Sequence, residues 1–146
     1  GELLYLASLT KNRNTKLIIN IQKETEALKG LLVILEKQYK SIINKETFEL
    51  DAIVDEIKLA NREVAKQEVE RRKLLNGKKV QDIINESGNK ELDRVYREIK
   101  MVLESIKHQN ETNDLLIKQQ LVFTNRMLNI INPKREKGTY NSYGRL

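Results

Sequence analysis

The stretch NETNDLLIKQQLVFTNRMLNIINP, residues 110–133, decides the fold. Its apolar side chains recur every three or four residues, which is the spacing of one face of an α-helix. Amide side chains interrupt this face where a plain apolar core has Leu or Ile. The face consists of Asn110, Asn113, Leu116, Ile117, Gln120, Leu121, Thr124, Leu128 and Ile131. Pro133 ends the helix, because proline lacks an N–H group and clashes with the preceding turn. We expect this face to bind a helix of another protein.

Upstream of this stretch the same apolar spacing continues, so the last helix is expected to begin near Lys90. It spans about 43 residues, or ~65 Å. Two earlier helices are predicted at about 16–43 and 48–75, each ~42 Å long. The polar connection between them is short, which predicts that they run antiparallel. About 20 Å of the last helix therefore has no long partner. A contiguous apolar surface of this kind marks an interaction site.

The chain is predicted to form one all-α domain, an antiparallel bundle of three long helices in residues 1–132. Residues 1–13 are expected to form a separate short helix, with Asn14 or Thr15 as the N-cap of the next helix. A further short helix is predicted over 78–86. Residues 133–146 are expected to be a flexible basic tail. The exposed end of the last helix could be covered by residues 1–13, by the 78–86 segment, by a second chain or by a client protein. Residues 1–13 would cover it either within one chain or between chains.

Composition excludes several classes of protein. Of 146 residues, 33% are charged, and the chain has only 6 Gly and 1 Pro, which argues against a β-rich fold that needs many turns. Cysteine is absent, which excludes disulfides and leaves the cytosol as the default compartment. The longest apolar run, Leu31–Leu35, is far shorter than the roughly 20 residues of a membrane span, so no membrane insertion is expected. Gly30 inside the second predicted helix suggests a close helix approach there.

No catalytic constellation is recognisable, so neither an enzyme nor a cofactor or metal is expected. His108 is the one histidine, and its neighbour Glu104 is an ordinary helix partner at i−4. Basic residues at 71–73 and 78–79 suggest a phosphate-binding patch, but cations near a helix C-terminus also complement the helix dipole. The net charge of +6 is diluted by interleaved Lys and Glu, so nucleic acid is not an expected partner.

Asn110 and Asn113 have two interpretations. Either both lie on an exposed face, or they form a polar layer inside an interface, where a buried Asn fixes the register of the packed helices. Their spacing to Ile117 favours the interface. The sequence leaves open whether that interface is with the bundle or with a client.

The order and spacing of several C-terminal segments resemble the FlgN-like flagellar export chaperones. These segments are NETNDLLIKQQLVFTNRML from Asn110, then Ile131-Asn132-Pro133, Gly138-Thr139-Tyr140 and Tyr143-Gly144-Arg145. The resemblance implies a bacterial cytoplasmic chaperone that binds the C-terminal helices of hook-associated proteins, prevents their premature assembly and delivers them to the flagellar type III export gate. It also implies that the client binds around Asn113–Ile131 and that Tyr140 docks on the export gate.

Two other functions remain as alternatives. The long helix could instead serve a self-associating coiled-coil structural or adaptor protein, so a homo-oligomer is left open. A weaker alternative is a basic helical protein that binds nucleic acid in a salt-dependent manner.

Overall fold

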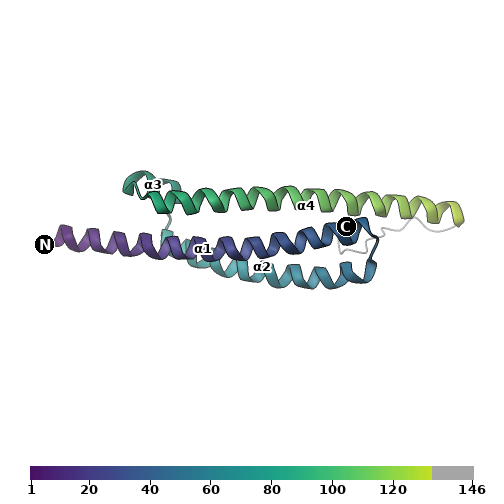
Figure 1. Ribbon diagram of the computed structural model, residues 1–146, viewed down its shortest axis with the longest axis horizontal. Helices are drawn as coiled ribbons and strands as arrows, with labels where there is room; N and C mark the ends of the chain where they lie inside the picture. The colour runs from purple at the N-terminus through teal and green to yellow at the C-terminus, as the bar shows by residue number, and fades with distance from the viewer. Residues whose placement is uncertain (133–146) are drawn as a thin grey trace.

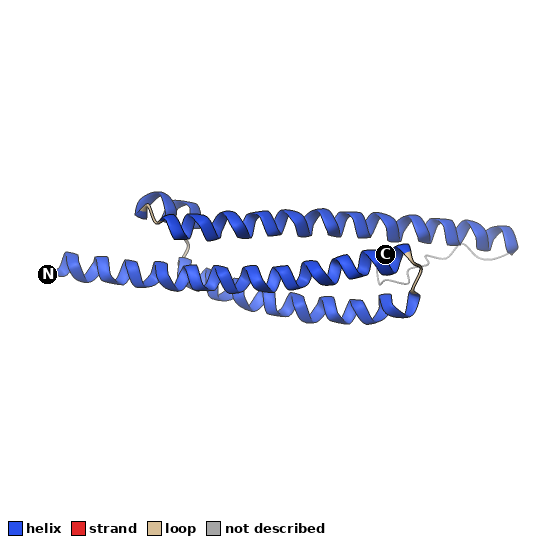
Figure 2. Ribbon diagram, in the orientation of Figure 1, coloured by secondary structure: helices blue, strands red, loops and turns tan. Residues whose placement is uncertain are grey.

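The computed structural model describes residues 1–132, which form four helices joined by short connections (Figures 1 and 2). The helices are α1 (Glu2–Ile43), α2 (Thr47–Leu75), α3 (Val80–Ser87) and α4 (Lys90–Ile131). No strand occurs within residues 1–132. The prediction of an all-α helical bundle is therefore confirmed. The predicted tail, 133–146, lies outside the described residues.

α1 is the central helix of the bundle. It packs against α2 on one side and α4 on the other, and α3 packs against the beginning of α4. α2 runs antiparallel to α1, whereas α4 runs parallel to α1 (Figure 1). The reversal between α1 and α2 needs only residues 44–46, while the 76–89 segment, which contains α3, brings the chain to the other side of α1.

The core follows the helical spacing of the apolar residues. The main cluster of buried side chains comes from α1, α3 and α4, with half-buried residues of α2 packed against it. Its buried members are Leu17, Ile21, Leu28, Leu31, Leu35, Val80, Ile83, Ile84, Leu92, Val95, Ile99 and Ile106. A helix of eight residues, such as α3, is not stable alone in water. It forms because it places Val80, Ile83 and Ile84 in this core.

The predicted break before residue 16 was wrong, because α1 is one continuous helix of 42 residues. Residues 2–13 contain no Gly or Pro, so nothing in them ends a helix. The hydroxyls of Thr10 and Thr15 donate to the carbonyl oxygens four residues earlier, of Leu6 and Lys11, each at 3.0 Å. These bonds satisfy the hydroxyls within the helix, and Asn14 is buried inside it and does not cap it.

Gly30 does not mark a close helix approach, as the sequence had suggested. A Cβ atom placed at this glycine meets no other atom within 4 Å, and the residue is exposed. The conformationally demanding positions lie instead at helix ends. Asn76 and Gly77 follow α2 with φ of 48° and 83°, and Gly88 follows α3 with φ of 61°. These left-handed conformations end each helix and turn the chain.

The long helices are staggered, so each end of the molecule has one projecting helix (Figure 1). Gln120 is level with Ile42 near the end of α1. The eleven residues 121–131 therefore continue beyond α1 for about 16 Å. Residues 2–13 of α1 project at the opposite end (Figure 1). Residues 1–13 and α3 of the same chain lie away from the projecting end of α4, so these two candidates to cover it within one chain were wrong (Figure 1). Cover by a second chain or by a client stays a prediction.

Candidate functional site

The face of α4 that the sequence singled out is divided into two parts near Leu121. The first part packs against α1, and the second part projects beyond the bundle. Because the two parts have different surroundings, they can serve different purposes. We call residues 121–131 the projecting end of α4.

Asn113 lies at the centre of the first part and is 1% exposed. Its Nδ2 donates to the carbonyl oxygen of Leu35 at 2.8 Å and to Oε1 of Gln38 at 2.9 Å. Its Oδ1 accepts a hydrogen bond of 2.9 Å from Nε2 of Gln109. A polar layer thus exists around Asn113, and it joins α4 to α1 within the bundle. The prediction that Asn110 shares this layer is wrong, because Asn110 is exposed. Every polar atom of the buried amide has a partner, as a buried polar layer requires.

Asn110, by contrast, is exposed. Ile99, Ile106 and Asn113 are buried at intervals of seven residues, and the half-buried Val102 and Gln109 divide each interval into steps of three and four. This alternation selects Gln109, which is half-buried, and turns Asn110 away from α1. The sequence reasoning missed Gln109 because it followed a four-residue step from Ile106 to Asn110. It also missed Gln38, which lies on α1. A strict heptad count would have found Gln109.

A second polar contact closes the end of the bundle. Nε2 of Gln120 donates to the carbonyl oxygen of Ile42 at 2.8 Å, in the last turn of α1. The last carbonyl groups of a helix have no partner within the helix, so this amide stabilises the end of α1. Around it, Ile42, Leu50 and Ile117 form a small buried cluster, and the half-buried Leu116 and Leu121 pack against it.

The projecting end of α4 carries an apolar surface that continues from this cluster. Thr124 is exposed, Leu128 is half-buried and Ile131 is 74% exposed. Seven of the residues from Leu121 to Ile131 are apolar, which is more than a single stripe of a surface helix holds. The sequence reasoning missed the second stripe, although the same three- and four-residue spacing reveals it. The exposed apolar residues that it omitted are Val122, Phe123, Met127 and Ile130.

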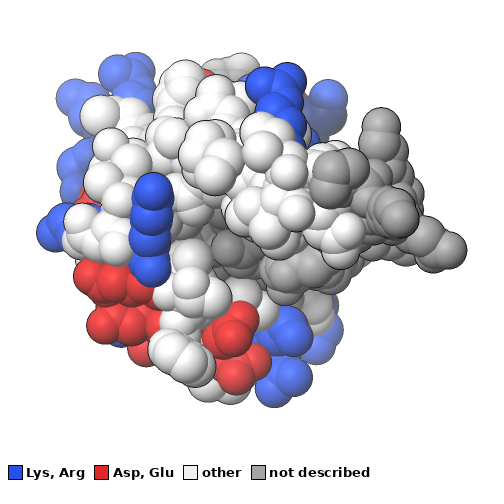
Figure 3. All heavy atoms as spheres, turned by 90° about the vertical axis from the view of Figure 1, so that its right-hand side faces the viewer, with Lys and Arg blue, Asp and Glu red and all other residues white. Residues whose placement is uncertain are grey.

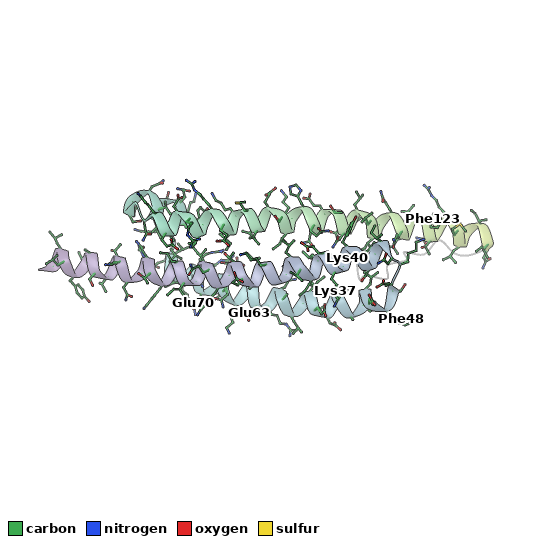
Figure 4. The ribbon with its side chains drawn as sticks, viewed as in Figure 1. Lys37, Lys40, Phe48, Glu63, Glu70 and Phe123 are labelled. Atoms are coloured by element: carbon green, nitrogen blue, oxygen red, sulfur yellow. The ribbon has the colours of Figure 1, made fainter. Side chains whose placement is uncertain are left out.

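The surroundings of the projecting end are weakly charged. Arg126 is the one charged residue within 121–131. A depression of about 320 Å³ beside it is lined by Lys118, Gln119, Val122, Phe123 and Arg126. Viewed from this end of the molecule, uncharged residues cover much of the upper part of the surface (Figure 3). Phe123 on α4 and Phe48 near the start of α2 both lie at this end (Figure 4). The arrangement suits an apolar partner with little charge.

A buried ion pair lies elsewhere in the bundle, between α1 and α2. Glu24 is 3% exposed and forms an ion pair with Arg71. Burial raises the pKa of Glu24 above its ordinary value, and the neighbouring Arg71 opposes this shift. His108 forms the expected contact with Glu104, at 3.4 Å on the surface.

Within residues 1–132 no group of three or more His, Asp or Glu side chains is arranged to hold a metal ion. In the same part of the chain, no helix combines the length and the apolar character needed to cross a bilayer.

Comparison with models of protein families identifies a relationship. The family model described as FlgN protein matches residues 13–146, which is nearly the whole chain. No curated protein and no solved structure matches. The matched segment begins close to the point where α1 leaves the bundle, and it includes all of α2, α3 and α4. The chain therefore belongs to the FlgN family of flagellar export chaperones.

Proposed function

We propose that this protein is a bacterial cytoplasmic chaperone that binds the C-terminal helices of hook-associated proteins, prevents their premature assembly and delivers them to the flagellar type III export gate. Membership of the FlgN family supports the general role. The observation that carries the client site is the exposed apolar end of α4, which has no partner helix within residues 1–132.

A client helix fits this end because the surface continues an existing helix interface. Up to Gln120, α4 packs against α1, and α1 ends at Ile43. A client helix placed beyond Ile43, in line with α1, would cover the same face of α4. It would bury side chains such as Leu128 and Ile131, and its own packing surface would then be unavailable for assembly. This is recognition of a helix through an apolar face.

The bundle contacts divide the predicted client residues into two groups. Asn113, Ile117 and Gln120 are engaged with α1 or with the small cluster beside it, so we assign them to holding α4 in register. Thr124, Leu128 and Ile131 lie beyond α1, and we assign these to the client together with Val122, Phe123, Met127 and Ile130. Leu121 lies at the junction, where it packs against the small cluster, and its contact with the client stays a prediction. Client contact by Asn110, which is exposed, and by Leu116 stays a prediction.

The direct test is a titration of the ¹⁵N-labelled full chain with a peptide that corresponds to the C-terminal helix of a hook-associated protein. We expect the amide resonances of residues 121–131 to shift and the resonances of the α1–α2 hairpin to keep their positions. A peptide concentration of roughly several hundred micromolar is enough to detect a weak complex, so the absence of any shift at that concentration would refute the proposal.

Delivery is assigned to Tyr140, which lies outside the described residues. Deletion of residues 134–146 should leave client binding unchanged and impair export of the client. Loss of client binding in this variant would refute the division between a client site on α4 and an export site in the tail.

A self-associating protein is the second candidate, and the opposite end of the molecule favours it. The projecting residues 2–13 of α1 expose Leu3, Leu4, Tyr5, Leu6 and Leu9. The two projecting helices lie at opposite ends, so they can meet only between chains. Light scattering over a dilution series distinguishes the candidates, because a tight oligomer that does not open for the client peptide favours self-association.

A further inference from the structure

A basic groove of about 480 Å³ lies at the end of the bundle where α2 ends and α4 begins. Five cationic residues line it: Arg71, Arg72, Lys78, Lys79 and Lys100. None of the described residues that line it is acidic. Its lining also includes the apolar side chains of Leu75, Ile99 and Leu103, which we call its apolar floor. The volume is within the range of about 300–1,000 Å³ that is usual for ligand sites.

Part of this positive charge is neutralised within the bundle. Arg71 pairs with the buried Glu24, and Arg72 pairs with Glu68. Lys78 lies 3.7 Å from Glu86.

Lys79 and Lys100 differ, because no ion pair within residues 1–132 joins either of them to a carboxylate. The ammonium group of Lys100 lies 4.5 Å from the centre of the Tyr96 ring. The groove therefore keeps an excess of positive charge next to an apolar floor.

The helix dipole does not account for this arrangement. Arg72 and Lys73 lie in the last turn of α2, where a cation is favourable. Lys79, however, is the N-cap residue of α3, and the N-terminus of a helix favours an anion. Lys100 lies within α4, far from either of its ends. Three different elements thus bring cations to one groove, and two of these cations lack a compensating charge.

We propose that this groove is a second docking site, and that it binds an acidic amphipathic segment of a partner protein. Carboxylates of the segment would pair with Lys79 and Lys100, while its apolar side chains would cover Leu75, Ile99 and Leu103. The apolar floor favours a protein over nucleic acid. Binding of single-stranded nucleic acid uses several exposed aromatic rings, whereas this groove offers only Tyr96, which Lys100 already covers.

The groove is separate from the projecting end of α4. Leu103 and Leu121 are eighteen residues apart on one helix, which corresponds to about 27 Å. A client at the projecting end and an acidic partner at the groove could therefore be bound together. The inference does not depend on the identity of the client, and its failure would leave the client site untouched.

The test uses the ¹⁵N-labelled full chain and a short synthetic helical peptide with Glu on one face and Leu on the other. We expect amide shifts confined to residues 71–81 and 96–103. A peptide in which every Glu is replaced by Lys should not bind, and a scrambled acidic peptide without an apolar face should bind at least several-fold more weakly. Shifts that map elsewhere, or none at a peptide concentration of about 1 mM, would overturn the proposal.

Variants locate the interaction on named residues. The double variant Lys79→Glu/Lys100→Glu should weaken binding at least about tenfold, since it reverses the two unpaired charges. Its matched control is Lys58→Glu/Lys107→Glu, which should change affinity less than about twofold. Lys107 is a well-matched control for Lys100, because each of these lysines precedes a Glu by four residues on α4. Leu103→Gln should weaken binding several-fold through the floor alone.

Two further measurements keep the result decisive. If charge reversal unfolds the chain, as seen in the melting temperature, the neutral variant Lys79→Gln/Lys100→Gln replaces it and should still weaken binding. A single-stranded oligonucleotide and inorganic polyphosphate are titrated in parallel. Equal or tighter binding of either one, with no effect of Leu103→Gln, would identify a general polyanion surface and overturn the proposal.

Discussion

Nδ2 of Asn113 in α4 donates a hydrogen bond of 2.8 Å to the main-chain carbonyl oxygen of Leu35 in α1. Leu35 is 1% exposed, so this bond lies in the middle of the apolar interface between the two long helices. A helix interface made only of Leu and Ile tolerates a shift of one helix along the other, whereas a buried amide bonded to one carbonyl does not. The bond therefore sets how far α4 projects beyond α1, and with it the length of the proposed client surface.

Replacement of Asn113 by Ala should destabilise the protein. The substitution removes a buried amide and leaves the polar groups of Gln38 and Gln109 without their partner, which costs about 2 kcal/mol. Urea denaturation followed by circular dichroism measures the change. Asn110→Ala is the matched control, because Asn110 is exposed one turn earlier, and its effect should stay within about 0.5 kcal/mol. Equal effects of the two substitutions would show that the polar layer has no role in stability.

The sequence predicts much of this architecture because the three- and four-residue spacing of the helix faces can be followed through α2 and α4, even where single polar residues stand on them. It predicts less where polar residues occupy core positions. In α1, Asn14 is buried, although the sequence suggested it as an N-cap, and Asn20 is buried as well. Asn20 is accommodated because its Nδ2 donates to the carbonyl oxygen and Oε1 of Gln67 in α2. That partner lies 47 residues away, so no local rule of helix formation reveals it.

The candidate site was predicted only in part for a related reason. Periodicity identifies which residues share one face of α4, but it does not show where the neighbouring helix stops. That point depends on the register of α1 and α4, which the contacts of Asn113 and Gln120 fix. Only with the register known does the face divide into a packed part before Leu121 and an exposed part after it. The exposure of Phe123 and Ile130 follows from the same register.

Replacement of Gly30 by Ala should stabilise the protein by about 0.5–1 kcal/mol, because Gly30 lies inside a helix and an added Cβ meets no other atom within 4 Å. Thermal denaturation measures the gain. Gly77→Ala provides the contrast, since Gly77 has φ of 83° and alanine is strained there. We expect a lower melting temperature for Gly77→Ala. A loss of stability in Gly30→Ala would reveal a contact at this position that the structure lacks.

The stability of the protein should carry a pH dependence that originates at Glu24. Burial raises the pKa of this carboxyl above its ordinary value of 4.5, although the pairing with Arg71 opposes the shift. A raised pKa means that the folded protein favours the protonated carboxyl. The ionised form therefore costs stability, and this cost appears as the pH rises above 4.5 through the folded-state pKa.

Glu24→Gln removes this titration and keeps an acceptor for Arg71. We expect its stability relative to the original protein to increase between about pH 4 and pH 7, as measured by urea denaturation at each pH. The matched control is Glu98→Gln, which removes an exposed carboxylate whose pKa is lowered by Lys29. Its relative stability should move in the opposite direction. A difference between Glu24→Gln and the original protein that is independent of pH would contradict the shifted pKa.

The projecting end of α4 should be separable from the stability of the bundle. Phe123 and Ile130 are 61% and 73% exposed, so Phe123→Gln/Ile130→Gln should leave the melting temperature nearly unchanged. If these residues contact the client, the same double variant should weaken binding of the client peptide by roughly tenfold or more, because contacts at the centre of an apolar interface carry most of its binding energy. Met101→Gln is the control, since Met101 is 72% exposed on the same helix but lies within the bundled part. Isothermal titration calorimetry measures the affinity of the original protein and of both variants for the same client peptide. Equal affinities would place the client elsewhere on the chain, whereas a loss restricted to the double variant would assign it to the part of α4 that α1 leaves uncovered.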